Sequence, residues 1–309
     1  MRQSYMDREQ IRPGPHHLFR DIRHKGRIIT ILQGIDPSLE QILAHLLENR
    51  GIDFSGYHPA MLERRVRQRR RVAGCGDMAG YCTYLLNNPG EIDNLLDAIT
   101  INVSLFFRDS LTFELIADQI LPALAREKMN RNEASLRIWS AGCARGEEPY
   151  SMAILVHELR DKEGWPEHVH FFATDIDPKA LGAAAKAQYA PESLQNVKFR
   201  LLNKYFSRHG EVFALNPEIR EMVTFSRYDL LDKAHGVPPE SVFGDFDLVL
   251  CRNVLIYFNL HYQAGIFERL YRALSPRGFL VLGMAEKPPE CFRNHFQRVF
   301  AFSRIYGRR

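Results

Sequence analysis

The apolar positions between residues 35 and 100 follow the three- and four-residue spacing of amphipathic helices. One face of the first helix carries Leu39, Ile42, Leu43, Leu46 and Leu47. Asp36 followed by Pro37 is a typical helix start, and Gly51 is a typical end. The same periodicity predicts four helices in this region, over residues 36–50, 58–73, 77–87 and 91–100. Residues 35–100 are therefore expected to form a small all-helical domain.

After residue 135 the pattern changes to short apolar runs that alternate with helical segments. Strands are expected over residues 136–141, 169–174, 246–251 and 279–283, with a last strand or hairpin over 297–306. Helices are expected between them, over residues 149–160, 178–187 and 261–274. Such alternation predicts a parallel sheet with helices on both faces, because the crossovers share one hand. The expected fold class is α/β, a doubly wound, Rossmann-like sheet whose ligands bind at the carboxyl ends of the strands.

The composition is that of a globular protein, with 45% hydrophobic and 25% charged residues among 309. No apolar run approaches the ~18 residues needed to cross a bilayer. The five cysteines are scattered and form no Cys-x-x-Cys pair. This usage favours a reducing, cytoplasmic location without a disulfide framework, and the sequence predicts no metal site.

Positive charge is concentrated at the N-terminal end. Residues 1–72 contain 14 Lys and Arg against 8 Asp and Glu, whereas the whole chain has a net charge of only +4. Residues 1–34 are polar and basic, and we expect a flexible extension with at most one short element, at 27–32. The excess of positive charge predicts an anionic partner for this end: nucleic acid, a membrane surface or an acidic protein.

The second expected helix carries six arginines within residues 61–71. At 100° per residue, Arg64, Arg67 and Arg71 fall on one stripe, and the apolar residues lie on the opposite side. The pattern predicts an amphipathic helix that presents cations to solvent. Nucleic-acid binding, a solvated surface and protein docking all agree with it, although no aromatic residues interleave the arginines to stack on single-stranded bases.

The turn after the first strand of the sheet contains Gly142 and Gly146, followed by Glu147 and Glu148 at a helix start. It lacks Gly-x-Gly-x-x-Gly, and two acids would repel a pyrophosphate at this helix N-terminus. The acids suit a ligand with a positive group, such as the ammonium of S-adenosylmethionine; alternatively, they only stabilise the helix dipole. The second strand ends at Asp175, whose carboxylate can accept hydrogen bonds from both ribose hydroxyls of a nucleoside.

Four segments of the chain, in this order, resemble the motifs of the CheR chemotaxis receptor methyltransferases. They are Asn-x-Ser-x-Phe-Phe-Arg (102–108), Gly-Cys-x-x-Gly-Glu-Glu-Pro-Tyr-Ser (142–151), Ala-Thr-Asp-Ile-Asp (173–177) and Cys-Arg-Asn-Val-Leu-Ile-Tyr-Phe (251–258). The resemblance includes the helical domain and continues to Tyr306. Two positions depart from the family pattern: Ser104 replaces a usual Thr, and Arg145 replaces a usual small residue.

The resemblance implies a class I methyltransferase with two domains. Residues 35–100 would form the receptor-docking domain, and residues 101–309 would bind S-adenosylmethionine and catalyse the reaction. A small β-subdomain is implied within the second domain, at about residues 205–228. The implied reaction transfers a methyl group to glutamate side chains on the cytoplasmic helices of chemoreceptors (methyl-accepting chemotaxis proteins), giving glutamate methyl esters and S-adenosylhomocysteine.

The resemblance also implies the residues of the site. Arg108 and Tyr257 would lie nearest the transferred methyl group. The implied cofactor contacts are Asn102, Ser104, Arg108, Ala141, Glu147, Asp175, Asp229, Leu230, Arg252 and Asn253. A glutamate carboxylate, with a pKa of about 4.3, is ionised at neutral pH and needs no general base. Arg108 would therefore position this carboxylate, while Tyr257 would orient one reactant by its hydroxyl or contribute only its ring to the core.

The resemblance favours protein docking as the role of Arg64, Arg67 and Arg71. The implied partners are chemoreceptor cytoplasmic domains, and we expect a monomer that neither binds nucleic acid nor inserts into a membrane. Two other functions compete with this one: a class I methyltransferase acting on RNA or DNA, and a non-catalytic scaffold that docks on receptors. The chain lacks the Pro-Pro-Tyr and catalytic-Cys motifs common in the former, and its intact set of site residues argues against the latter.

Overall fold

The computed structural model describes residues 19–24, 27–32, 36–232, 234–241 and 243–309. The chain divides into two compact units, which we describe separately. The first ends at Ile92, and the second contains residues 93–309 together with residues 56–58. None of the helices in the described part of the chain is both long and apolar enough to cross a bilayer.

An antiparallel hairpin precedes the helices of the first unit. Its strands are β1 (Phe19–His24) and β2 (Arg27–Leu32). The sequence predicted an element over residues 27–32 but not its partner, because three charged residues interrupt the apolar pattern of β1. The other residues of the expected flexible extension lie outside those that the structure describes.

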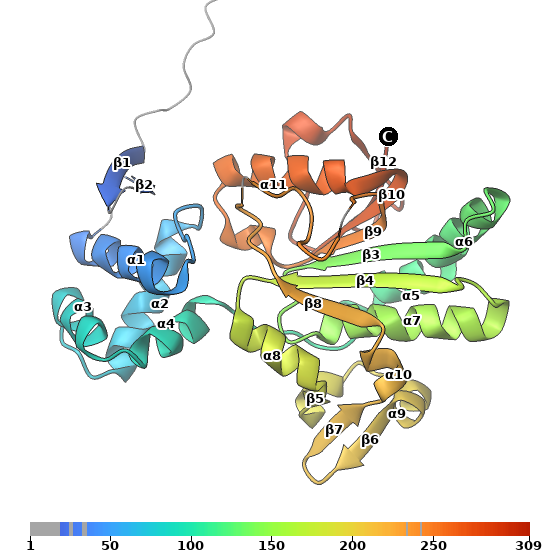
Figure 1. Ribbon diagram of the computed structural model, residues 1–309, viewed down its shortest axis with the longest axis horizontal. Helices are drawn as coiled ribbons and strands as arrows, with labels where there is room; N and C mark the ends of the chain where they lie inside the picture. Colours follow the sequence, from blue (N-terminus) through green and yellow to red (C-terminus); the bar gives the residue numbers. More distant parts are fainter. Residues whose placement is uncertain (1–18, 25–26, 33–35, 233, 242) are drawn as a thin grey trace, which may run out of the picture. The chain divides into compact units, whose positions relative to one another are not determined.

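The first unit also contains three complete helices and the start of a fourth: α1 (Pro37–Arg50), α2 (Pro59–Val72), α3 (Met78–Asn87) and α4 (Glu91–Ile99) (Figure 1). All four helices expected from the sequence are confirmed. The Asp36 carboxylate accepts a hydrogen bond of 2.8 Å from the backbone N–H of Ser38, and Gly51 ends α1 with a φ of 64°. The apolar faces of α1 and α2 are buried, and both helices contact α3.

Glu91 joins three helices of this unit. Only 4% of its surface is exposed, and its two carboxylate oxygens accept hydrogen bonds from Arg69 Nε at 2.6 Å and Arg69 Nη2 at 2.7 Å. The Tyr81 hydroxyl donates a third hydrogen bond to the same carboxylate at 2.9 Å. Charge-assisted, bidentate contacts of this kind are among the stronger polar interactions in proteins. One of the six arginines of α2 therefore serves the fold of the unit.

We predict that Glu91→Gln destabilises the first unit by about 1.5–3 kcal/mol, the range for hydrogen bonds to charged groups. Arg67→Gln is the matched control, because it removes an exposed pair with Glu63 that contributes only about 0.5 kcal/mol. Hydrogen exchange at the amides of α2 and α3 reports the unfolding of this unit by itself. Equal effects of the two substitutions would contradict a structural role for Glu91.

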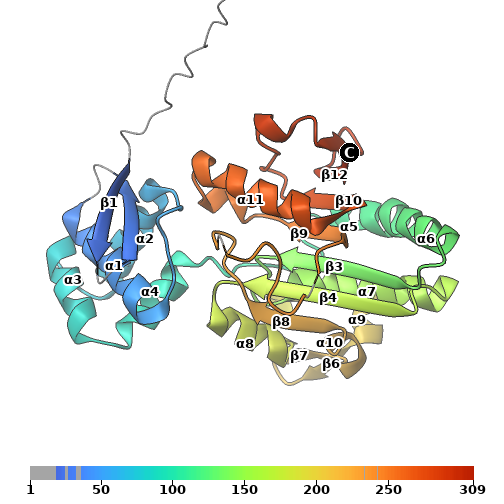
Figure 2. The same cartoon turned by 45° about the horizontal axis from the view of Figure 1, so that its top comes forward.

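The second unit is built on a seven-stranded mixed sheet (Figures 1 and 2). Its strands, in spatial order, are β11 (Phe296–Arg298), β12 (Ile305–Arg308), β10 (Leu274–Leu282), β9 (Phe246–Cys251), β3 (Ser135–Ala141), β4 (His168–Asp175) and β8 (Val223–Arg227). The five strands from β10 to β8 are parallel, as the sequence predicted for four of them, whereas β8 was not expected in this sheet. The sheet is not wholly parallel, because β11 and β12 form an antiparallel hairpin along β10. Only a short turn separates these two strands, which leaves no room for a crossover helix.

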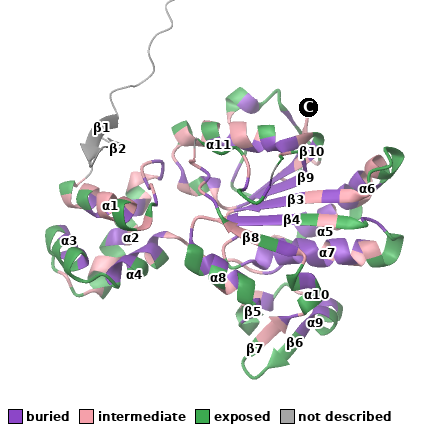
Figure 3. Cartoon of the chain, viewed as in Figure 1, coloured by how far each residue is buried: buried purple, intermediate pink, exposed green. Residues whose placement is uncertain are grey.

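Helices cover both faces of this sheet (Figures 1 and 2). They are α5 (Ser110–Leu115), α6 (Leu121–Asn130), α7 (Glu147–Glu163), α8 (Pro178–Lys186) and α11 (Leu260–Ala273), with a π-turn (Ile116–Ile120) joining α5 to α6. Side chains of α5, α6 and α7 share one hydrophobic cluster with Ile138, Phe171 and Leu248 from three strands. Figure 3 shows these central strands as the most continuously buried part of the sheet. The segment over residues 110–130 was not anticipated from the sequence.

A second, three-stranded sheet is inserted before β8. It consists of β5 (Gln188–Tyr189), β7 (Val212–Leu215) and β6 (Phe206–His209), in that order, with the short helices α9 (Phe199–Tyr205) and α10 (Pro217–Arg220) nearby in the chain. The expected β-subdomain at 205–228 therefore differs from the observed one. Its last expected strand, β8, pairs with β4 instead, with Val223 opposite Phe171. Val223 and Phe225 pack in the hydrophobic cluster of the large sheet, which accounts for this placement.

Candidate active site

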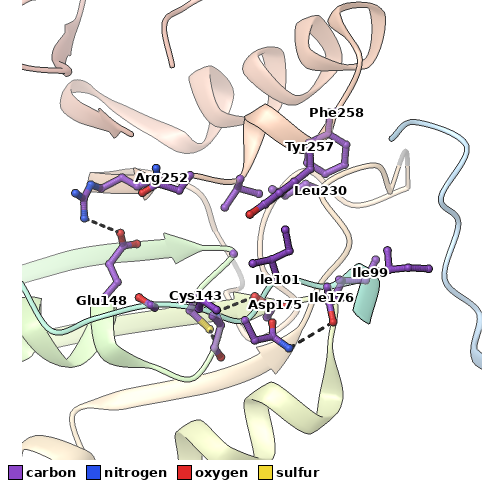
Figure 4. A pocket seen from close by; sticks show the side chains of 18 of the residues that line it. Ile99, Ile101, Cys143, Glu148, Asp175, Ile176, Leu230, Arg252, Tyr257 and Phe258 are labelled. Carbon is purple, nitrogen blue, oxygen red and sulfur yellow. Dashed lines mark hydrogen bonds and ion pairs between the residues drawn. The ribbon is translucent and has the colours of Figure 1, made fainter. Parts of the chain in front are cut away.

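A pocket lies at the carboxyl ends of β3, β4 and β9 (Figure 4). The order of the sheet reverses between β3 and β9, which is the usual ligand position in doubly wound sheets. The pocket encloses about 970 Å³, part of it open to solvent. Nine of the eleven site residues implied by the motifs line it: Asn102, Ser104, Arg108, Asp175, Asp229, Leu230, Arg252, Asn253 and Tyr257.

The other two implied residues do not line the pocket in this structure. Ala141 is the buried last residue of β3, and Glu147 is the first residue of α7. The pocket is also lined by Glu148, Tyr57 and Tyr228, none of which was among the implied site residues. Tyr57 could not be found from the motifs, because it reaches the site through a β-bridge to Phe258 far away in the sequence.

Asp175 ends β4 and joins two loops at the floor of the pocket. Its Oδ2 accepts a hydrogen bond of 2.8 Å from the backbone N–H of Ala144, and its Oδ1 accepts one of 3.0 Å from that of Asp177. Burial raises the pKa of Asp175, and these backbone hydrogen bonds oppose the rise. Each carboxylate oxygen has a further lone pair that can accept a hydrogen bond from a ligand hydroxyl.

Asn102 is held by a neighbouring acid. Its Nδ2 donates a hydrogen bond of 2.6 Å to Asp177 Oδ2, which also accepts one of 3.0 Å from the Thr100 hydroxyl. The other oxygen of Asp177 caps α8 by accepting from the backbone N–H of Lys179 at 2.8 Å. Asp177 therefore fixes the segment before Ser104 to the start of α8, and Asn102 lines the pocket as part of that segment.

The glycine turn after β3 approaches the loop after β9 very closely. Gly142 has a φ of 79°, and a Cβ placed on it would lie 2.4 Å from Val254 Cγ2. A side chain at this position would therefore be excluded both by the backbone conformation and by contact. Close packing of these two loops forms the wall of the pocket between β3 and β9.

The two acids at the start of α7 have different environments. Glu148 accepts a hydrogen bond of 2.8 Å from the Ser140 hydroxyl and pairs with Arg252 Nη1 at 3.2 Å, as Figure 4 shows. Glu147 is 2% exposed, and its Oε2 has no hydrogen-bond partner among the described residues. Burial raises the pKa of Glu147 to about 7. An unpaired buried carboxylate is costly, so Glu147 suits a cationic group from a ligand, whereas Glu148 is already neutralised by the protein.

Arg252 holds the main chain that carries Arg108. Its Nη2 donates hydrogen bonds to the carbonyl oxygen of Arg108 at 2.7 Å and to Asp109 Oδ2 at 2.8 Å. Ser151 Oγ accepts a hydrogen bond of 2.9 Å from the backbone N–H of Phe107 on the other side of the turn. Phe107 and Asp109 have positive φ values, of 53° and 58°, which non-glycine residues rarely adopt. The turn is thus held from two elements in a conformation that it would not keep alone.

Tyr257 lies in a single turn of 3₁₀ helix (Leu255–Tyr257) after β9. Its carbonyl oxygen accepts a hydrogen bond of 2.9 Å from the backbone N–H of His58, and the next residue, Phe258, packs against Tyr57 with ring centroids 4.7 Å apart. Tyr257 and Phe258 both line the pocket. The ring of Tyr257 is therefore at the pocket wall, where its hydroxyl can meet a ligand.

Comparison with known protein families covers nearly the whole chain. Residues 102–304 match the model described as "CheR methyltransferase, SAM binding domain", and residues 37–100 match "CheR methyltransferase, all-alpha domain". The chain belongs to the CheR methyltransferase family. It is therefore an S-adenosylmethionine-dependent methyltransferase, and both the cofactor and the fold class predicted from the sequence are confirmed.

Individual relatives agree with this family. The "Chemotaxis protein methyltransferase" of Escherichia coli strain K12 is 32% identical over 86% of this chain and 87% of its own length. "Chemotaxis protein methyltransferase 2" of Pseudomonas aeruginosa is 33% identical over 80% of this chain and 85% of its own. An uncharacterized 104.1 kDa protein of Rhodobacter capsulatus is 32% identical over 82% of this chain, which spans only 26% of that longer protein.

The pocket fits the cofactor of the family. S-adenosylmethionine supplies a methyl group on a positively charged sulfur, and it also carries an ammonium and a ribose. The paired lone pairs of Asp175 suit ribose hydroxyls. The unpaired carboxylate of Glu147 has the charge that suits the ammonium, but Glu147 does not line the pocket in this structure. Among the residues that the structure describes, no group of three His, Cys, Asp or Glu is arranged to hold a metal ion.

We predict that Arg252→Lys lowers kcat by about tenfold or more, because a single ammonium cannot reproduce the fork that holds the turn before α5. Arg137→Lys is a matched control, since Arg137 also donates hydrogen bonds to backbone carbonyl oxygens, but of Gly244 and Phe243 near the start of β9. Steady-state kinetics with S-adenosylmethionine measures both variants. Equal kcat values for Arg252→Lys and the wild type would show that the turn needs no such support.

Proposed function

We propose that this enzyme transfers the methyl group of S-adenosylmethionine to glutamate carboxylates on the cytoplasmic helices of chemoreceptors. The products are glutamate methyl esters and S-adenosylhomocysteine. The observation that supports this proposal best is Arg108, a half-buried cation in the pocket. Its guanidinium has no acidic partner among the described residues, and the one hydrogen bond described for it goes to the carbonyl oxygen of Val103 at 3.3 Å. Such a group can bind a substrate carboxylate.

The chemistry requires little beyond position. A substrate carboxylate is ionised at neutral pH, so the pocket needs no general base. The positive charge of the sulfonium and the negative charge of the carboxylate neutralise one another as the methyl group is transferred. A cation such as Arg108 therefore stabilises the carboxylate more before the reaction than in the transition state. Arg108 therefore serves as a clamp that orients the carboxylate, and the Tyr257 hydroxyl aligns it by a hydrogen bond.

In this proposal the cofactor is bound by the remaining residues of the pocket and by Glu147, which precedes the pocket-lining Glu148 at the start of α7. Asp175 accepts hydrogen bonds from the ribose hydroxyls, and Glu147 pairs with the ammonium. Asp229 and Leu230, after β8, contact the adenine side. Asn102 and Asn253 also line the pocket as cofactor contacts: Asp177 holds the side chain of Asn102, and Glu286 holds the backbone of Asn253.

Methyl transfer to purified chemoreceptor fragments tests the proposal. Labelled methyl groups should appear on receptor glutamates and be released by mild base, as expected of esters. Arg108→Ala should abolish transfer and Arg108→Lys should restore little, because a lysine cannot form the bidentate contact. Arg277→Ala, at an exposed arginine paired with Glu127, is the control and should behave as wild type. Base-stable labelling, or full activity of Arg108→Ala, would contradict the proposal.

Glu147 predicts a pH dependence of cofactor binding. Its carboxyl has a pKa of about 7 in the free enzyme, and an adjacent ammonium favours the ionised form, so binding lowers that pKa. Below pH 7 binding must then release a proton, and affinity should rise by about tenfold per pH unit until it levels off above pH 7. Calorimetry with S-adenosylhomocysteine in buffers of different ionisation enthalpy measures this proton release. Glu147→Gln should abolish it; release that persists in the variant would assign it to another group.

The arginine stripe of α2 is proposed as the receptor-docking surface. Arg64, Arg67 and Arg71 are exposed, whereas Leu62 and Val66 are buried, so the predicted orientation of the helix is confirmed. Arg67 pairs with Glu63 at 2.6 Å, which leaves Arg64 and Arg71 as the stronger attractants for an acidic helix. Charges at the rim of an interface act mainly on the association rate.

We also propose that the enzyme works as a cytoplasmic monomer.

Reversal of two charges tests this docking surface. Arg64→Glu with Arg71→Glu should raise the KM for receptor fragments by about tenfold and leave cofactor affinity unchanged, and the effect should shrink as salt rises. The matched control is Arg272→Glu with Arg293→Glu, two exposed arginines of the second unit. If the stripe variant keeps its KM but loses affinity for nucleic acid, an RNA or DNA methyltransferase becomes the better proposal.

A further inference from the structure

Glu286 is a buried acid that holds the loop after β9 through its backbone. It is 4% exposed and lies outside the pocket. Its Oε2 accepts hydrogen bonds from the backbone N–H groups of Asn253 at 2.9 Å and Gly283 at 2.7 Å. Its Oε1 accepts from those of Leu255 at 2.8 Å and Ile256 at 3.3 Å. One carboxylate therefore accepts hydrogen bonds from three backbone N–H groups of this loop and ties them to the end of β10.

Gln263, on α11, holds the carbonyl oxygens of the same loop. Its Nε2 donates hydrogen bonds to the carbonyl of Leu255 at 3.0 Å and to that of Phe258 at 2.9 Å. These two residues flank Tyr257. The loop is thus held at its N–H groups from one side and at its carbonyl groups from another.

The loop would not keep this conformation without such contacts. Asn253 has a φ of 59°, in the left-handed region that non-glycine residues rarely adopt. Gly283 is required for the approach of Glu286, since a Cβ at this position would lie 2.8 Å from Glu286 Oε2. Because the N–H groups after a strand end have no neighbouring strand to accept them, a side chain must do so.

We propose that Glu286 and Gln263 are positioning residues for methyl transfer. Together they fix the loop over 253–258, so that Asn253 meets the cofactor and Tyr257 meets the reacting groups. This inference rests on the proposed role of Tyr257. Neither residue lines the pocket. The two residues hold different parts of the loop: Glu286 holds the Asn253 end and the middle, whereas Gln263 holds only the part around Tyr257.

Isosteric substitutions test this division. Glu286→Gln places an amide group opposite N–H donors, and Gln263→Glu removes both donated hydrogen bonds. The control is Asp247→Asn, at the opposite end of β9: Asp247 is also buried and accepts a hydrogen bond of 2.9 Å from the backbone N–H of Arg137. Each variant is measured for hydrogen exchange of the loop amides, for S-adenosylhomocysteine affinity and for kcat.

Glu286→Gln should speed exchange at Asn253, Leu255 and Ile256 by about tenfold, weaken cofactor affinity and lower kcat by about tenfold. Gln263→Glu should lower kcat while affinity stays within about threefold of wild type, and Asp247→Asn should change none of these quantities. A general loss of stability would move all three variants alike and would overturn the inference.

Combination with Tyr257→Phe shows whether the effect on kcat passes through that residue. In the Tyr257→Phe background, Gln263→Glu should lower kcat much less than in the wild type, because the positioned hydroxyl is already gone. Equal losses in both backgrounds, or unchanged amide exchange in Glu286→Gln, would contradict the inference. If the wild type esterifies no receptor glutamates, the proposed function fails, and the exchange data still decide whether Glu286 holds the loop.

Discussion

The backbone N–H groups beyond the carboxyl ends of the strands need hydrogen-bond acceptors. The shape of the whole site depends on which groups accept those hydrogen bonds. Parallel strands leave those groups without a partner where the chain turns into a loop. In this protein carboxylates accept them: Asp175 binds the glycine turn to the end of β4, Asp177 caps α8, and Glu286 holds the loop after β9. These acids fix the loops that form the pocket, and Asp175 also lines it.

Buried cations complete this arrangement. Arg252 neutralises Glu148 and at the same time fixes the turn that carries Arg108. Arg252 therefore serves the structure of the site, whereas Arg108 has no acidic partner among the described residues. The pocket therefore contains a cation without an acidic partner among those residues, and this cation is complementary to a carboxylate of the substrate.

The sequence predicted most of the fold, because its signals were local. The cap at Asp36 and the apolar run of β9, which only Asp247 interrupts, each specify an element without help from distant residues. The pairing of β8 with β4 and the antiparallel edge hairpin depend on contacts between distant segments, so periodicity could not place them. For the site, the motifs identified residues that come together, but not the direction of their side chains. Arg252 and Asn102 lie at the pocket and point their polar groups at protein partners, and Glu286 belongs to none of the motifs.

We propose that Asp175 binds the ribose of the cofactor through the lone pairs that its two backbone partners leave available. Calorimetric titration of S-adenosylhomocysteine into wild type and Asp175→Asn tests it most directly, because asparagine keeps one acceptor for the backbone and loses the charge. We expect the variant to bind S-adenosylhomocysteine at least about tenfold more weakly, since each hydrogen bond to a charged group contributes about 1.5–3 kcal/mol. Its thermal unfolding should change little. Unaltered affinity in a folded Asp175→Asn variant would contradict it.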